Sequence, residues 1–410
     1  MFICSDEKCF GCALCSAVCN TKAIDIIDDS GFYRPVIAEE KCIKCGRCVS
    51  VCPTVKIEQN MLSSIYEPDL CLAAININRK KRYNASSGGI ARLLAEEHIK
   101  AGGFVVGVSF NVTNHNAEFK LFNTLDDLKN MSNSMYVQTF KKNIYDDIHN
   151  AIQQKPGLFI GVPCDIFAFK TYLKTISKDI KNETYFVDLL CRGSASPKCF
   201  RSHIDYVSKN EKVTDVSFRG GDYDCCLTLY NGSKVVYQGE QLKDPYFKYF
   251  MRHSLYQRMC FTCPFAGKSR IGDITLGDFW GLDYEVENRF GGQKSGINLM
   301  CINNAKGRNL INNIKSNIYS EERPFKEAQK GNTTLQYPTE MPKEYDSLWK
   351  VIEKDGFMHA INVIYGENYP EICNTWEEAF KARKRNIFLL KLKENHPKLY
   401  SVWSKLKKKS

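Results

Sequence analysis

The sequence predicts a protein of the α+β / α/β class, in which a small cysteine-rich domain precedes a larger, mixed α/β domain. Two runs of four regularly spaced cysteines lie within residues 1–58. Beyond them, apolar strand patterns alternate with helical patterns as far as residue 330. The chain has 410 residues, of which 43% are hydrophobic, so it is long enough to bury the cores of two or three domains.

The cysteine runs predict the chemistry of the first domain, residues 1–58. Both have the spacing Cys-x2-Cys-x2-Cys-x3-Cys, which is typical of bacterial ferredoxins with two [4Fe-4S] clusters. In that pattern the fourth cysteine of each run binds the other cluster. We therefore expect a first group of Cys9, Cys12, Cys15 and Cys52, and a second group of Cys42, Cys45, Cys48 and Cys19. Structural zinc is the alternative, but its four ligands are usually two separated pairs.

Two details of this domain bear on the assignment. Asn20 stands where a proline usually follows the fourth cysteine, whereas Pro53 keeps the usual residue in the second run. The segment between the runs reads as a strand, a glycine-containing turn and a second strand. This is the hairpin expected of a ferredoxin-like domain.

Residues 59–83 read as a polar connector, and residues 84–330 as an α/β domain with parts 84–150 and 151–330. A helix is expected within 88–103, followed by strands at 104–110 and 117–122. The pattern strand, cysteine, helix then occurs twice, around Cys164 and around Cys191. Because parallel strands end at the same sheet edge, we expect these two cysteines to be neighbours. The elements expected next are a strand at 213–218, a hairpin turning at Asn231-Gly232, a helix near 245–257, and a last strand and helix.

A third metal site is predicted from a Cys-x-x-Cys pair in the second half of the chain. Cys260 and Cys263 supply two thiolates, and Cys164 and Cys191 are the best candidates for the other two. The alternative is that these are ordinary buried thiols. Other candidates for the fourth ligand are Cys199, in an expected helix, and Cys225 and Cys226, adjacent on an expected strand and so facing opposite sides. We expect Cys4, Cys71, Cys301 and Cys373 to be structural.

Composition and charge indicate where the protein acts and which classes of protein it does not belong to. Nineteen cysteines and no leader or long apolar run favour a cytoplasmic metalloprotein over a secreted or membrane-spanning one. The sequence "AGKS" at 266–269 is not a P-loop, because Thr262 stands where its first glycine belongs. The net charge of +11 comes mostly from the tail, residues 376–410, which follows an extension at 331–375. This basic, amphipathic tail could contact an anionic membrane surface, remain solvated or bind an acidic partner; no nucleic-acid motif accompanies it.

A flavin would connect one-electron clusters to two-electron chemistry on an organic substrate. No Gly-x-Gly-x-x-Gly motif occurs, but "NASSGG" at 84–89 leads into the expected helix. Free N–H groups at a helix start can hold a pyrophosphate. The flavin site is therefore predicted at Ser86, Ser87, Gly88 and Gly89. An ordinary helix N-cap is the alternative.

Four motifs together carry a family resemblance: "NASSGG", "IGVPCD", "VDLLCRGSASPK" and "CFTCPFAGKSRIGDITLGDFWG". Following a two-cluster ferredoxin domain, they resemble the coenzyme F-420 hydrogenase/dehydrogenase beta subunit family over residues 1–330. The resemblance implies FAD, a [4Fe-4S] cluster held by Cys164, Cys191, Cys260 and Cys263, and a flavin-binding α/β domain. Arg192 replaces the usual His after the cysteine and Ala195 a common Pro, so the acceptor need not be the deazaflavin. Asp273 and Asp278 are weak catalytic candidates, as is Arg192; turn or cap carboxylates are the alternative for the two aspartates.

These observations predict an iron-sulfur flavoprotein oxidoreductase that passes electrons between its clusters and FAD and exchanges hydride with an organic substrate. Some relatives are associated with surface polysaccharide synthesis, which is one expected role. The alternative is an electron-transfer beta subunit of a hydrogenase/dehydrogenase complex that reduces a deazaflavin coenzyme; a redox-sensing protein is a third interpretation. The expected partners are a ferredoxin or another oxidoreductase subunit, with the protein in the cytoplasm or at the inner face of the membrane.

Overall fold

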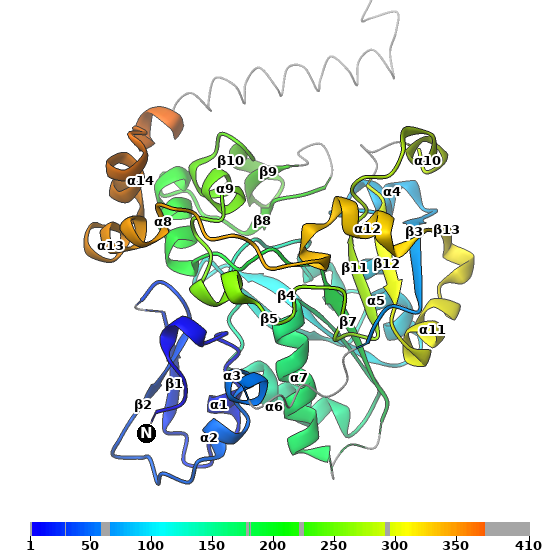
Figure 1. Cartoon of the computed structure of the whole chain (residues 1–410), viewed down its shortest axis with the longest axis horizontal. Coiled ribbons are helices and arrows are strands. Elements are labelled where there is room, and N and C mark those ends of the chain that lie inside the picture. The colour runs from blue at the N-terminus through cyan, green and yellow to red at the C-terminus, as the bar shows by residue number, and fades with distance from the viewer. Residues whose placement is uncertain are drawn as a thin grey trace, which may run out of the picture.

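The computed structural model describes residues 2–28, 30–58, 66–177, 180, 182–220, 225–291 and 296–373. It contains a small N-terminal domain, a large domain built on an eight-stranded sheet, and a helical layer with a three-stranded sheet. Figure 1 shows the N-terminal domain in blue, at the lower left, beside α6 and α7. The predicted basic tail lies outside the described residues. No helix among the described residues is long and apolar enough to cross a membrane.

The N-terminal domain is a hairpin flanked by short helices. Strands β1 and β2 pair antiparallel, with Ile24 opposite Ile37 and Ile27 opposite Arg34, which confirms the hairpin expected between the two cysteine runs. The third cysteine of each run lies in a short helix, Cys15 in α1 and Cys48 in α2, and the first two cysteines of each run lie on the loop before that helix. The elements are η1 (Asp6–Lys8), α1 (Leu14–Ala17), β1 (Ile24–Ile27), β2 (Arg34–Ile37), α2 (Arg47–Ser50) and α3 (Pro53–Glu58).

The large sheet has the strand order β13-β3-β12-β11-β7-β6-β4-β5. Its centre is parallel, because β4, β6, β7 and β11 run in one direction, and the strands added at both sides are antiparallel. This mixed sheet confirms the mixed α/β class. The strands are β3 (Leu70–Asn76), β4 (Phe104–Asn111), β5 (Asn116–Phe122), β6 (Gly157–Gly161), β7 (Thr184–Leu189), β11 (Ile274–Asp278), β12 (Asn298–Ile302) and β13 (Ile318–Glu322).

Helices cover both faces of this sheet. On one face α5 and α11 pack over a core that includes Leu93, Val105 and Met300. On the other face α6 and α7 pack over Phe159 and Phe186, and α10 and α12 cover the end near β3 and β12. The helices are α4 (Arg79–Tyr83), α5 (Ile90–Lys100), α6 (Ile144–Ile152), α7 (Pro163–Thr175), α10 (Tyr284–Arg289), α11 (Ala305–Asn312) and α12 (Phe325–Gly331), with the 3-10 turns η2 (Asp127–Asn130), η7 (Lys315–Asn317) and η8 (Thr333–Leu335).

The predicted connector at 59–83 is wrong over its described part. Residues 70–76 form β3, which pairs with β12 on one side and β13 on the other. Ala73 and Ala74 are fully buried there. The run "LCLAAIN" is apolar at most positions because both of its faces are covered by protein, as in buried strands generally. The large domain therefore begins before residue 84.

A separate aromatic core joins the three-stranded sheet to four helices. The Asn231-Gly232 hairpin is present, with Asn231 opposite Lys234, and its two linking residues are Gly232 and Ser233. Helices α13 and α14, from the predicted extension 331–375, pack into this core beside α8. The elements are α8 (Pro197–Ser208), β8 (Asp215–Ser217), β9 (Cys226–Asn231), β10 (Lys234–Glu240), α9 (Pro245–Met251), η5 (Arg258–Thr262), α13 (Tyr345–Asp355) and α14 (Phe357–Tyr365).

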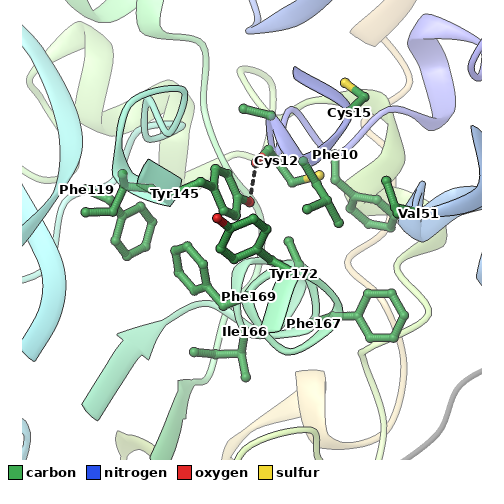
Figure 2. Close-up of a cluster of buried hydrophobic side chains, with 14 of the residues drawn as sticks. Phe10, Cys12, Cys15, Val51, Phe119, Tyr145, Ile166, Phe167, Phe169 and Tyr172 are labelled. Atoms are coloured by element: carbon green, nitrogen blue, oxygen red, sulfur yellow. Dashed lines mark hydrogen bonds between the residues drawn. The ribbon is translucent and has the colours of Figure 1, made fainter. Parts of the chain in front are cut away.

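The N-terminal domain and the large domain share one hydrophobic core. Phe10, Cys12 and Val51 pack with Tyr145 and Phe169 of α6 and α7 in a single buried cluster. The Tyr145 hydroxyl donates a hydrogen bond to the Cys12 carbonyl at 2.7 Å, which Figure 2 shows as a dashed line. The cysteine loops are thus held against the large domain by buried contacts.

Candidate metal centres

The first cysteine group is buried where the two domains meet. Its four side chains, Cys9, Cys12, Cys15 and Cys52, are between 6% and 9% exposed. The loop that carries Cys9 and Cys12 turns through positive φ angles of 65° at Gly11 and 60° at Ala13. The Gly11 amide lies 3.4 Å from Cys9 Sγ and donates to it. Hydrogen bonds of this kind to ligand sulfurs are a usual feature of iron-sulfur sites.

A fifth cysteine, Cys4, lies at this first group, although its isolated position in the sequence suggested only a structural role. Its thiol is hydrogen-bonded to Cys52 and Cys9, and these contacts raise the pKa of Cys4. The same contacts lower the pKa values of Cys9 and Cys52.

The second cysteine group, Cys42, Cys45, Cys48 and Cys19, lines one pocket of about 390 Å³. Cys45 is exposed, so this group reaches the surface of the N-terminal domain. The Ala23 amide donates to Cys19 Sγ at 3.3 Å. The structure therefore places Cys19, the fourth cysteine of the first run, beside the first three cysteines of the second run.

The four cysteines predicted for the third site line a single pocket of about 580 Å³, part of which is open to solvent. Cys191 follows the end of β7, and Cys260 and Cys263 lie in and just after η5. Cys164 is the second residue of α7 rather than the end of a strand. A helix N-terminus stabilises a thiolate, so this position suits a metal ligand.

The competing cysteines lie elsewhere. Cys199 is 1% exposed within the aromatic core around α8, and Cys226 is 1% exposed at the start of β9. The expectation that Cys225 and Cys226 share a strand is wrong: Cys225 precedes β9 and has a φ angle of 57°. None of the three lines the third pocket.

The chemistry of the third pocket fits a [4Fe-4S] cluster. Burial raises the pKa of Cys260 to about 12 and those of Cys164 and Cys191 well above the ordinary value. Burial raises the pKa of Cys263 as well, so these four thiols need a strong local positive charge to become thiolates, which the iron of a cluster would supply. The Ser194 amide already donates to Cys260 Sγ at 3.4 Å. Among the described residues, no three His, Cys, Asp or Glu side chains lie close enough together to bind one metal ion. The ligands of a [4Fe-4S] cluster stand further apart than that, because each binds a different iron atom.

A buried ion pair that the sequence did not indicate supports the third pocket. Arg270 lines the pocket, is 2% exposed, and contacts the fully buried Asp188 with Nη2 at 2.6 Å from Oδ1. Its other donors reach the carbonyls of Phe265 and Gly267. Arg270 thereby ties the loop that follows Cys263 to strand β7, which leads to Cys191. The only sign of this ion pair in the sequence is Asp188, an acidic residue within the apolar strand run "TYFVDLL".

A second buried ion pair lies near both the first cysteine group and the third pocket. Lys141 Nζ is 3.2 Å from Asp165 Oδ1, and the two side chains are 3% and 6% exposed. Asp165 follows Cys164 directly. Burial raises the pKa values of Cys12 and Cys164, and the nearby charge of Lys141 acts in the opposite direction on both. The pair is therefore close to both groups.

The hydroxyls predicted to bind flavin are occupied within the protein. Ser86 Oγ accepts a hydrogen bond from the Ser134 amide at 3.0 Å. Ser87 Oγ donates to the Ile297 carbonyl at 3.2 Å.

Packing against the sheet also accounts for the two glycines. A Cβ on Gly88 would lie 2.6 Å from the Ala74 carbonyl of β3, and Gly89 has a φ angle of 82° at the start of α5. The loop by itself therefore gives no independent sign of FAD.

The weak catalytic candidates lie in different places. Asp273, 3% exposed, accepts hydrogen bonds from the Phe186 amide at 2.8 Å and from Asn304 Nδ2 at 2.9 Å. It precedes β11, at the sheet edge opposite Cys191, which fits the structural alternative. Asp278 ends β11 and pairs with Arg219 at 3.0 Å.

Arg192 is exposed and lines the third pocket. Its carbonyl accepts a hydrogen bond from Thr339 Oγ1 at 2.7 Å. Of the three weak candidates, Arg192 is the one at this pocket.

Two family models match the chain, and both agree with the resemblance. Residues 156–328 match the family model for the C terminus of the beta subunit of coenzyme F420 hydrogenase/dehydrogenase, and residues 8–55 match the 4Fe-4S dicluster domain. A chain in the xenon-derivatised F420-reducing [NiFe] hydrogenase complex from Methanosarcina barkeri is 15% identical, with a TM-score of 0.46 over 73% of this chain and 92% of that chain. No curated protein sequence matches significantly. The family resemblance is thus confirmed over the matched residues.

Proposed function

We propose, from the matches of residues 156–328 and 8–55 to the beta-subunit family and the dicluster domain, that this chain is the electron-transfer subunit of an oxidoreductase. It carries electrons between a redox partner and a two-electron organic acceptor, for which a deazaflavin coenzyme is the first candidate. We favour this over a free-standing enzyme of surface polysaccharide synthesis, because both matched descriptions belong to electron-transfer proteins.

The observation that carries the proposal is the convergence of four distant cysteines on one pocket beside the ferredoxin-type domain. Cys164, Cys191, Cys260 and Cys263 come from three separate elements. Phe10, next to Cys9, lines the same pocket and contacts Phe265 with ring centroids 5.8 Å apart. Such an arrangement suits electron transfer from the N-terminal domain to the large domain.

The residues of the chain hold and insulate the proposed clusters. Backbone amides donate to the ligand sulfurs at all three groups, which stabilises the negatively charged thiolates. Aromatic side chains between the first group and the third pocket exclude water. FAD, which the resemblance implies, would supply the exchange between one-electron and two-electron transfer. Its proposed position at Ser86–Gly89 remains a prediction from sequence.

Anaerobic purification with iron, sulfide and flavin assays tests the proposal. Three [4Fe-4S] clusters correspond to about twelve iron atoms per chain. The substitution Cys260→Ser should lower this to about eight and abolish reduction of an added deazaflavin, because one cluster loses a ligand.

Cys199→Ser is the matched control, since Cys199 is buried outside the third pocket and the iron content should not change. About eight iron atoms in the unmodified protein would contradict the third cluster. Isolation of the chain from its native cells together with a second oxidoreductase subunit would support the subunit assignment, and a lone chain that turns over an organic substrate would oppose it.

A further inference from the structure

The two ferredoxin-type cysteine groups differ in exposure. The four cysteines of the first group are at most 9% exposed. In the second group Cys45 is exposed, and Ile43, between Cys42 and Cys45 in the chain, has 67% of its surface in solvent. Of these two groups, the second is therefore the one that an external protein can approach closely.

The first group lies on the side of the third pocket. Phe10 extends from the first group into the lining of that pocket. The Tyr145 hydroxyl of the large domain donates a hydrogen bond to the Cys12 carbonyl at 2.7 Å, and Phe10 packs against Phe265, which lines the same pocket. The order in space is thus the second group at the surface, the first group behind it, and the third pocket in the large domain.

The rim of the second group has a distinct chemistry. Among the residues that line its pocket, the charged ones are Lys44 and Arg47, both basic and both exposed. Lys41 and Lys22 lie exposed on the two loops that form the pocket, and the acidic Glu39 and Glu40 are in the same stretch but do not line it. An exposed apolar side chain bordered by basic groups is the arrangement that binds an acidic protein surface.

We propose that Ile43, Lys44 and Arg47 form the docking site for an acidic one-electron carrier of the ferredoxin class. The inference rests on the proposed function in one respect, that the second group holds a [4Fe-4S] cluster. In the transfer step the reduced carrier loses one electron and the cluster of the second group gains it. No bond forms or breaks and no proton moves.

The test uses the cluster-loaded full chain, purified anaerobically, and a small acidic 2[4Fe-4S] ferredoxin. Binding of the oxidised ferredoxin is measured by calorimetry, and reduction of the clusters by the reduced ferredoxin is followed by stopped-flow absorbance. The double variant Lys44→Glu/Arg47→Glu should bind at least about tenfold more weakly at low ionic strength. The difference should shrink as salt is added, because salt screens exposed charges. Ile43→Ala should weaken binding to a similar degree at all salt concentrations.

Lys326→Glu on α12 is the matched control, since Lys326 is an exposed lysine on a helix far from the N-terminal domain (Figure 1). It should leave binding unchanged. All variants should keep their iron content and be reduced by dithionite at the rate of the unmodified protein.

Equal affinity of the double variant and the control, or failure of the unmodified protein to bind the ferredoxin, would overturn the docking site. These readouts do not require an organic acceptor. A failure of deazaflavin reduction with normal cluster reduction would instead count against the proposed function alone.

Discussion

At the scale of single residues, Arg270 shows how one buried cation can organise a site built from distant segments. It contacts Asp188 on β7 and two carbonyls in the loop after Cys263. Asp188 also accepts the Gly272 amide at 2.6 Å, so both carboxylate oxygens are engaged. A buried charge that loses its partner is strongly destabilising, which makes this pair sensitive to substitution.

Arg270→Met should therefore damage the third site more than the rest of the protein. The unpaired Asp188 carboxylate and the released loop should lower the iron content from about twelve to about eight atoms per chain. Arg270→Lys should give an intermediate content, because lysine restores the charge but lacks the planar set of donors.

Iron and sulfide assays check this expectation, together with electron paramagnetic resonance of the reduced protein. Arg308→Met is the control, since that arginine is 52% exposed and pairs with Asp69 at the surface. Full iron content in Arg270→Met would show that the loop holds its position without the pair.

At the scale of elements, the helix starts and helix packing decide where chemical groups lie. Proline at the first position of α7 ends the strand-like segment, so the next residue, Cys164, falls at the positive end of the helix. On the opposite face of the sheet, α5 buries His98 against the residue before β6, and His98 Nε2 lies 3.1 Å from the Pro156 carbonyl. The packing of α5 against the sheet thus buries a titratable side chain, His98.

The stability of the large domain should depend on pH through His98. Burial lowers the pKa of His98 below its ordinary value of 6.5. The unfolded chain therefore binds a proton that the folded chain does not, and the stabilising contribution is present above about pH 6.5 and lost as the pH falls. The Tm of the unmodified protein should fall more steeply than that of His98→Gln between about pH 7 and pH 5.5. If the Tm of both proteins fell equally with pH, His98 would not be the cause of the pH dependence.

At the scale of the whole molecule, the ferredoxin-type domain is part of the core rather than an appendage. Figure 2 shows Cys12 against Tyr145 across the domain boundary, and Phe10 and Tyr172 belong to the same buried cluster. The buried pair of Lys141 and Asp165 lies at the same boundary. The two domains should therefore unfold together.

Lys141→Met should destabilise both domains, because it leaves Asp165 buried without its partner. The expected loss is about 3–5 kcal/mol, and the double variant Lys141→Met/Asp165→Leu should recover most of it. Thermal unfolding followed by circular dichroism and by loss of cluster absorbance checks whether the two transitions stay together.

Lys129→Met is the control for this substitution, since Lys129 is 76% exposed in a surface pair. A fall in stability of Lys129→Met as large as that of Lys141→Met would contradict the role of burial. Two separate transitions in the unmodified protein would contradict the shared core.

Local sequence was a reliable guide wherever the interaction is local. The hairpin between the cysteine runs, the Asn231-Gly232 hairpin and the mixed α/β class were predicted correctly, because spacing and alternation reflect contacts between near neighbours. The connector prediction failed because β3 is a strand whose partners, β12 and β13, lie more than two hundred residues further along the chain. A short apolar run flanked by charged residues does not reveal partners at that distance.

The sequence by itself determined the ligand spacing of the N-terminal domain and named the four cysteines that line the third pocket. Only the tertiary structure brought Cys4 to the first group, paired Arg270 with Asp188 and Lys141 with Asp165, and exposed one ferredoxin-type group while burying the other. The reason is physical. The ligand spacing of a cysteine run depends only on residues close together in the sequence, whereas the partner of a buried charge and the exposure of a loop depend on which distant elements pack around them.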